Sequence, residues 1–177
     1  MNCKNLKSID IPASVTTLGR WIFEGCANLK DITLHEGLTT LSASTFYGCG
    51  ITEIDIPTTV SEIPDYCFGE TKLTTITIPS TVKSVGFGAF FGYNYSKLSK
   101  VTFKGTTPPE VIYNTDADGN YSKPNVEKMQ SCQVYVPASA IEAYKESEWF
   151  KGTYAYDSQS YPGPTDYFNE DNLNAIE

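Results

Sequence analysis

The sequence lacks several features that mark common functional classes. It contains a single histidine, His35, which excludes histidine-rich metal sites and leaves any Ser-His-Asp triad dependent on that one residue. It contains no CxxC pair, so neither a zinc ribbon nor a redox motif is supported, and GxGxxG and P-loop motifs are missing as well. No apolar run approaches the ~18 residues that a membrane span requires. No basic-then-apolar signal segment follows Met1.

Positive charge is also scarce. The 177 residues include 13 Lys and Arg against 21 Asp and Glu, which gives a net charge of -8. Residues 1–105 hold nine residues of each sign, whereas residues 106–177 hold four basic and twelve acidic residues. Because no basic stripe exists, we expect neither nucleic acid nor an anionic membrane surface as a partner.

Apolar side chains recur along the chain at intervals of 22 to 25 residues. Five units start at Leu6, Leu29, Ile51, Leu73 and Leu98. Three residues later come Ile9, Ile32, Ile54, Ile76 and Val101. Five residues later come Ile11, Leu34, Ile56, Ile78 and Phe103. Seventeen residues after the start, four units carry Phe23, Phe46, Phe68 and Phe90. The alternation of apolar and polar positions at the third and fifth offsets predicts a strand in each unit.

The repeat predicts a solenoid. Pro12, Pro57 and Pro79 end three of the strands, because proline cannot donate to a ladder, and the remainder of each unit returns through a compact loop with little helix. One unit cannot bury its apolar face alone, whereas stacked units can. We therefore expect a right-handed superhelix with a parallel β-sheet on one face and a stack of phenylalanines inside.

The pattern "LxxIxIPxxVxxIxxxxFxGCxxL" resembles the leucine-rich repeats of the BspA-like bacterial surface family, over about residues 1–105. Three departures affect local loops: His35-Glu36 replaces the proline step, the third repeat lacks the Cys before its successor, and an insertion occupies residues 93–97. The resemblance implies a bacterial cell-surface or secreted protein that acts in adhesion or protein recognition. It implies no cofactor and no catalytic site.

Three segments are expected along the chain. Residues 1–105 form the repeats, of which the first is truncated because "NCKNL" matches "GCANL" in the middle of a unit; the native protein is therefore expected to be longer. Residues 106–151 form an extended last repeat and a cap, in which Val134 and Val136 alternate as a strand and Ser139 with Glu142 predicts a capping box for a short helix. Residues 152–177 are an acidic, Tyr- and Pro-rich tail or linker.

Two columns of polar residues should face outward from the strands, between the inward apolar ones. The first column holds Ser8, Asp31, Glu53, Thr75 and Lys100, and the second holds Asp10, Thr33, Asp55, Thr77 and Thr102. Leucine-rich repeats commonly use this face for recognition, so these ten residues are the predicted binding site. The alternative is a surface that serves solubility and stacking only. The two columns contain no aromatic residue, which argues against sugar binding.

The five cysteines give no disulfide framework, because their number is odd. Cys3, Cys26 and Cys49 occupy equivalent positions in successive repeats. The spacing of about 4.8 Å between strands lies within the ~4.4–6.8 Å Cα range of a disulfide. A buried cysteine more often acts as a small hydrophobic residue, so we expect reduced, structural thiols. Cys67 and Cys132 have no obvious partner.

A weak calcium site is a further candidate. Asn114, Asp116, Asp118 and Gly119 fit the first half of an EF-hand loop, but Asn125 stands where a bidentate Glu is needed, and Asp and Gly also favour ordinary turns. Asn94 and Asn120 each begin an "NYS" sequon. If the source is bacterial, as the resemblance implies, these asparagines should be unmodified.

Catalysis has little support in the sequence. Asp31 and Glu53 could lie at the separation of a glycosidase pair, but an open strand face does not raise the pKa of a carboxyl group. We therefore expect a non-enzymatic module that binds a protein ligand, such as a host surface or matrix protein. A structural spacer within a longer surface protein and a carbohydrate-binding module, which could use Tyr113 or Tyr121, remain alternatives.

Overall fold

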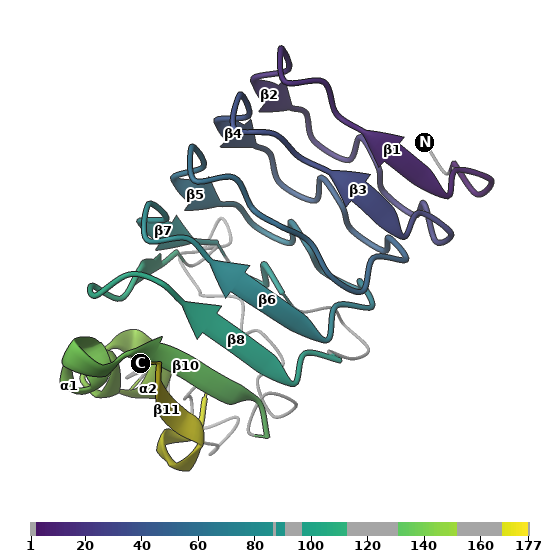
Figure 1. Ribbon diagram of the computed structural model, residues 1–177. Helices are drawn as coiled ribbons and strands as arrows, with labels where there is room; N and C mark the ends of the chain where they lie inside the picture. Colours follow the sequence, from purple (N-terminus) through teal and green to yellow (C-terminus); the bar gives the residue numbers. More distant parts are fainter. Residues whose placement is uncertain (1–2, 87, 91–96, 113–130, 152–167, 177) are drawn as a thin grey trace, which may run out of the picture.

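The computed structural model describes residues 3–86, 88–90, 97–112, 131–151 and 168–176. Within these ranges the chain winds through a stack of similar coils, each lying on the one before it (Figure 1). Each coil consists of an extended segment on one side, a turn, a shorter segment on the other side and a loop that returns to the next coil. The expected leucine-rich-repeat solenoid is confirmed.

The first row of strands is parallel. It consists of β1 (Ser8–Asp10), β3 (Asp31–Thr33), β6 (Thr75–Ile78), β8 (Lys100–Phe103), β10 (Gln133–Pro137) and β11 (Leu173–Ile176). Ile9 pairs with Ile32, and Val101 pairs with both Ile76 and Val134. Residues at equivalent positions of the repeat therefore lie next to each other in neighbouring strands. We call the outward side of this row the strand face and each repeat's segment in it a rung.

The row is interrupted at the third rung. Residues 53–55 occupy the place of a strand but form none, so β1 pairs with β3 in one sheet and β6, β8, β10 and β11 form another. Ile54 and Ile56 still point into the core, where both are buried. The third repeat therefore keeps its packing but loses its ladder hydrogen bonds. The sequence did not predict this break.

A second, shorter row of strands lies on the other side of the coils. It contains β2 (Thr17–Leu18), β4 (Thr40–Leu41), β5 (Glu62–Ile63), β7 (Ser84–Val85) and β9 (Glu110–Val111). The first two pair with each other, and the last three form a parallel sheet in the order β5-β7-β9. The repeat pattern predicts only a return loop in this part of each unit, because two-residue strands are too short to show a period.

A turn follows each of the first four rungs. The carbonyl oxygens of Pro12, His35, Pro57 and Pro79 each accept a hydrogen bond from the backbone N–H three residues later, at 2.9 to 3.1 Å. Proline suits this position because it cannot donate to a ladder, and it therefore ends the rung where the turn begins. His35 makes the same turn without proline, which explains why the departure in the second repeat leaves the fold intact.

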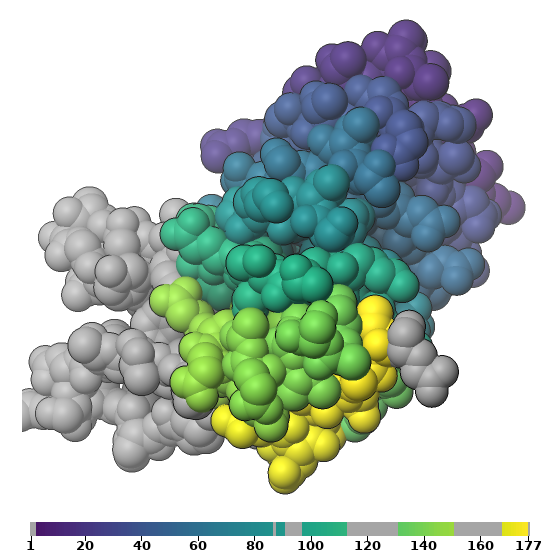
Figure 2. Space-filling model, turned by 60° about the vertical axis from the view of Figure 1, so that its left-hand side comes forward, coloured from purple at the N-terminus to yellow at the C-terminus, as the bar shows by residue number. Residues whose placement is uncertain are grey.

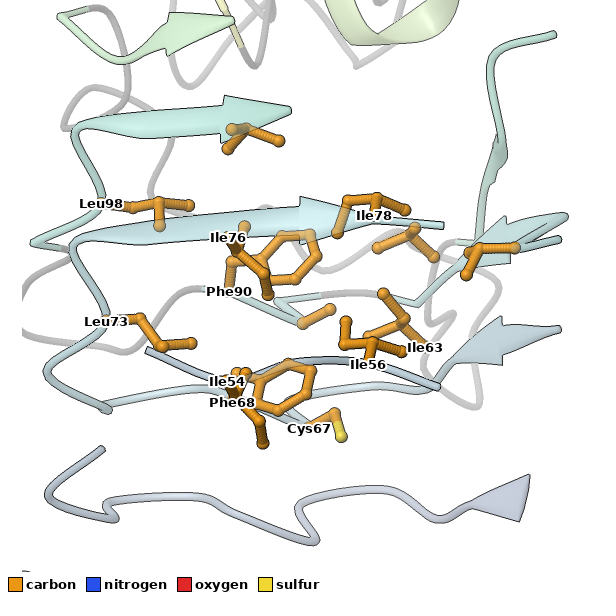
Figure 3. Packing of buried hydrophobic residues seen from close by; sticks show 14 of the residues in the cluster. Ile54, Ile56, Ile63, Cys67, Phe68, Leu73, Ile76, Ile78, Phe90 and Leu98 are labelled. Carbon is orange, nitrogen blue, oxygen red and sulfur yellow. The ribbon is translucent and has the colours of Figure 1, made fainter. Parts of the chain in front are cut away.

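The interior is filled by the predicted phenylalanine stack. The rings of Phe23, Phe46, Phe68 and Phe90 lie nearly parallel, with centroids 5.5 to 6.2 Å apart. These distances exceed the spacing of successive rungs, so the rings are offset along their planes, which is a favourable aromatic arrangement. Figure 3 shows Phe68 and Phe90 beside the inward isoleucines of the third and fourth rungs.

The return loops are also bonded from coil to coil. The N–H of Phe23 donates to the carbonyl of Thr45, and the N–H of Phe46 donates to that of Cys67. The first three loops pass through two residues of left-handed conformation each, and Gly25, Gly48 and Glu70 take the second place. The first place, with φ of 52 to 61°, holds Trp21, Ser44, Tyr66 and Gly88. Only the fourth is a glycine, so the other three hold a conformation that disfavours a side chain.

The C-terminal end of the stack is covered by β10, β11 and short helices. After β10 come the 3-10 helix η2 (Ala138–Ala140), α1 (Ile141–Lys145) and α2 (Glu148–Lys151), and η3 (Glu170–Asn172) precedes β11. Figure 2 shows the last segment lying against this cap. The Trp149 ring stacks on Phe168 with centroids 5.7 Å apart, and its Nε1 donates to the Pro109 carbonyl at 2.8 Å.

Two expectations about this end need correction or extension. The capping box is wrong, because α1 begins only after the 3-10 turn that contains Ser139, and its N-cap, Ala140, makes no side-chain hydrogen bond. Glu142 contacts Lys145 instead, at 3.1 Å. The strand β11 was not predicted within residues 152–177, and it pairs in parallel with β10 from Val134 to Pro137.

Candidate recognition surface on the strand face

The strand face presents the two polar columns that the repeat pattern predicts. Nine of the ten residues in these columns are exposed, namely Ser8, Asp10, Asp31, Thr33, Glu53, Asp55, Thr75, Thr77 and Lys100. The expectation was wrong for Thr102, which is only 8% exposed. In the register, Thr102 lies between Thr77 and the larger Tyr135, which is not among the ten predicted residues.

Asp10 is held by a residue outside the columns. Its Oδ1 lies 2.6 Å from Nε2 of His35, and the two side chains are 72% and 41% exposed. Next to this pair, the Glu36 carboxylate accepts hydrogen bonds from the Thr58 hydroxyl at 2.8 Å and the Thr58 N–H at 3.1 Å, which lower the pKa of Glu36. His35 and Glu36, which replace the proline step in the second repeat, thus bond this repeat to the first and the third.

A groove lies over the second, third and fourth rungs. Its volume is about 380 Å³, and it is centred on the third rung, where the ladder is interrupted. It is lined by Lys30, Asp31, Ile32, Thr33, Glu53, Ile54, Asp55, Thr75, Ile76 and Thr77. Six of the ten predicted surface residues therefore meet in one concavity, which separate columns in the sequence do not reveal.

The charged groups of this groove have no partner within the described part of the chain. The side chains of Asp31, Glu53 and Asp55 form no hydrogen bond or ion pair there, and neither does the ammonium group of Lys30. All four are exposed. The groove therefore carries three carboxylates against one amine, and these groups are available to a ligand.

The other end of the strand face has a different character. The Lys100 ammonium group lies 4.5 Å from the centroid of the Tyr135 ring, within range of a cation–π contact. Tyr135 is an aromatic residue in the outward column, so the expectation that the columns contain none holds only for the first five rungs. Beyond it, Asn174 of β11 donates to Gln133 and closes the polar face at the cap.

The cysteines lie mainly in the interior. Cys26, Cys49, Cys67 and Cys132 are buried, whereas Cys3 is exposed. Burial raises the pKa of the Cys49 and Cys132 thiols to about 12 and that of Cys67 still more clearly. The Cys49 thiol also donates to the Phe23 carbonyl at 3.1 Å. Protonated, buried thiols are poor nucleophiles, so the environment of these four residues is that of packing groups.

The remaining candidates can be placed only in part. The calcium candidate Asn114, Asp116 and Asp118 and the sequon residues Asn94 and Asn120 lie outside the described residues. Among the residues that are described, no three His, Cys, Asp or Glu side chains are grouped to hold a metal ion. No helix in those same ranges is long and apolar enough to cross a membrane.

The stacked coils, the parallel rungs and the inner phenylalanine column define a leucine-rich-repeat protein. The family described as BspA type leucine rich repeat region matches residues 1–112 in six copies. The chain belongs to this family, as its repeat pattern indicated. Proteins of the family are typically associated with the cell surface and are generally not enzymes. A comparison with curated proteins gave no match.

Two solved structures are similar to the chain. The pneumococcal vaccine antigen PcpA has a TM-score of 0.53 at 16% identity, over 97% of this chain and 41% of its own. A leucine-rich repeat protein from Bacteroides ovatus has a TM-score of 0.36 at 16% identity, over 76% of this chain and 56% of its own. The chain thus spans about half or less of these proteins. At this identity, the first likeness concerns the fold alone.

Proposed function

We propose that this chain is a non-enzymatic cell-surface module that recognises a protein ligand through its strand face. The observation that carries the proposal is the groove of about 380 Å³ over the second to fourth rungs, whose charged side chains have no partner among the described residues. Exposed side chains on a rigid, repeated scaffold can be presented to a partner with little loss of conformational freedom. A surface position suits adhesion to host surface or matrix proteins.

Filling the groove without changing its charge tests this proposal. Thr75→Tyr/Thr77→Tyr places two rings on the fourth rung, at exposed positions where aromatic residues are well tolerated in strands. The matched control is Thr17→Tyr/Thr40→Tyr on β2 and β4, where both threonines are exposed on the other side of the coils. The three proteins are used to capture labelled host surface and matrix proteins.

A ligand that binds the parent and the control but not the groove-filled variant supports recognition by the strand face. Equal capture by all three places the binding site elsewhere. No capture by any of them favours the structural spacer within a longer protein.

A carbohydrate-binding role has one observation in its favour, the Tyr135 ring on the outward face beside Lys100. Aromatic rings stack on sugars, but one face of this ring is already approached by the ammonium group. A glycan array probed with the parent chain and with Tyr135→Ala distinguishes this role, because only a sugar ligand that stacks there is lost.

A further inference from the structure

Within the described residues, the row of paired strands is interrupted at the third rung. The N–H and C=O groups of residues 53–55 form no backbone hydrogen bond with another described residue, although Thr74 still donates to the Thr52 carbonyl just before the break. The facing edges of β3 and β6 each lack the neighbour that the rest of the row provides. The floor of the groove is therefore more polar than a continuous sheet would be.

The charges around this rung repel one another. Asp31 and Glu53 belong to the same outward column on successive rungs, and both line the groove. Asp55 follows two residues after Glu53 on the same face. Like charges on neighbouring strands are destabilising, and no described side chain neutralises these three carboxylates. Asp10, by contrast, is already paired with His35.

On this basis we infer that the groove takes an extended, basic segment of the protein partner, with alternate Lys or Arg side chains directed at Asp31, Glu53 and Asp55. The inference rests on the proposed recognition role of the strand face. An extended chain places side chains i and i+2 on one side, about 6.6 Å apart, and Glu53 and Asp55 are likewise two residues apart on one face of their rung. Thr33, Thr75 and Thr77 supply hydroxyl groups on the two flanking rungs.

Other ligand classes fit the groove less well. A single cation needs several ligands around one point, and no three acidic side chains of the described residues are grouped in that way. A drug-sized molecule prefers an enclosed apolar cavity, whereas this groove is open and polar. Sugars would stack on aromatic rings, and none lines the groove. Separated ammonium or guanidinium groups on one extended chain match the separated carboxylates best.

A synthetic peptide with lysine at alternate positions between serines tests the inference, and the same peptide with glutamate in place of lysine is the probe control. Binding of the fluorescein-labelled peptides is measured by anisotropy at low and at physiological ionic strength. The variant is Asp31→Asn/Glu53→Gln/Asp55→Asn. The matched control is Glu24→Gln/Glu62→Gln/Glu110→Gln, which removes the same charge from exposed positions off the strand face.

The lysine peptide should bind the parent and the control equally, bind the variant at least about tenfold more weakly, and bind less tightly as salt rises. The variant should melt no lower than the parent, because the substitution relieves repulsion. Equal binding to parent and variant, an equal loss in the control, or equal binding of the glutamate peptide would overturn the inference.

The two variants distinguish the proposed recognition by the strand face from the inference that the ligand is a basic segment. If a captured protein ligand is lost from the tyrosine-filled groove but kept by the charge-neutral variant, the strand face is a recognition surface and the basic-segment inference is wrong. If neither variant changes capture or peptide binding, both are wrong.

Discussion

Phe46 is the residue on which the inner stack depends most directly. Its side chain is fully buried, and its ring lies 5.7 Å from that of Phe23 and 5.5 Å from that of Phe68. Phe46→Ala should lower the free energy of unfolding by about 3–5 kcal/mol, because it leaves a cavity between two coils that the backbone ladder prevents from closing. Urea unfolding followed by circular dichroism measures this change.

Trp21→Ala provides the control for Phe46→Ala. Trp21 is also aromatic, but its side chain is 52% exposed, so its removal should change the free energy of unfolding by no more than about 0.5 kcal/mol. Similar effects of the two substitutions would contradict the assignment of Phe46 to the core.

The buried thiol of Cys49 should make the free energy of unfolding depend on alkaline pH. Its thiol has a pKa of about 12 in the folded chain, raised by burial, against 9.0 for an exposed thiol. A group whose pKa is raised on folding holds its proton more tightly in the folded state. The stability that it contributes is therefore complete below pH 9.0 and is lost as the pH rises towards about 12. Unfolding free energies measured on both sides of pH 9.0 should fall with pH, and the decline should be shallower in Cys49→Ala.

Cys3→Ala is the corresponding control, because Cys3 is exposed. Its decline with pH should match that of the parent chain, because the substitution leaves the Cys49 thiol in place. If Cys49→Ala declined as steeply as Cys3→Ala, burial of the Cys49 thiol would contribute nothing to the pH dependence.

At the scale of elements, the sequence was most informative about the rungs. The third and fifth offsets predicted the inward residues of every rung, and the register confirms this alignment from Ile9 to Val134. A repeat makes such a prediction robust, because equivalent positions in all units occupy the same place in the fold, and each unit supports the assignment separately. The outward direction of the polar columns follows from the same alternation.

Other elements could not be predicted because they depend on contacts between units. The strand β11 has no repeat partner and owes its place to its pairing with β10 and to the aromatic contact of Phe168 with Trp149. Apolar periodicity sets which side chains are buried but not whether adjacent backbones bond, so the break at the third rung left no sequence signal. The groove and the contact of Asp10 with His35 were missed for the same reason.

The close approach of the first and second repeats depends on Gly50. A Cβ at this position would lie 3.2 Å from the Leu29 carbonyl oxygen and still closer to the carbonyl of Ala27, and both are backbone atoms. Gly50→Ala should therefore force the two repeats apart and cost about 1–3 kcal/mol. Differential scanning calorimetry should show a lower Tm.

Gly19→Ala offers a matched control for Gly50→Ala, since a Cβ at Gly19 would meet no atom within 4 Å. This change should be neutral or stabilise the chain by up to about 1 kcal/mol, through the unfolded state. A Gly50→Ala protein as stable as Gly19→Ala would mean that the two repeats are less closely packed than the structure indicates.

At the scale of the whole molecule, the two ends of the stack differ. In the first coil Leu6, Ile9 and Val15 are only partly buried, whereas the equivalent residues of the third repeat, Ile51, Ile54 and Val60, are buried. At the other end Tyr144, Trp149, Phe150 and Phe168 form an aromatic layer over the last coil. Among the described residues, this covered end carries five exposed acidic side chains, Glu142, Glu146, Glu148, Glu170 and Asp171.

The cap should therefore control self-association. Without residues 152–177 the outer edge of β10 loses its pairing with β11, and Trp149 loses the Phe168 ring. An open strand edge is a template for pairing with another chain, so a protein that ends at Lys151 should elute as larger species in size-exclusion chromatography with light scattering and should melt lower than the parent. Glu170→Ala/Asp171→Ala lowers the acidic charge while keeping β11, and it should elute like the parent. A monomeric truncated protein with an unchanged Tm would show that β11 does not protect the stack. Association of the double-alanine variant would instead make the acidic charge of the cap the protecting feature.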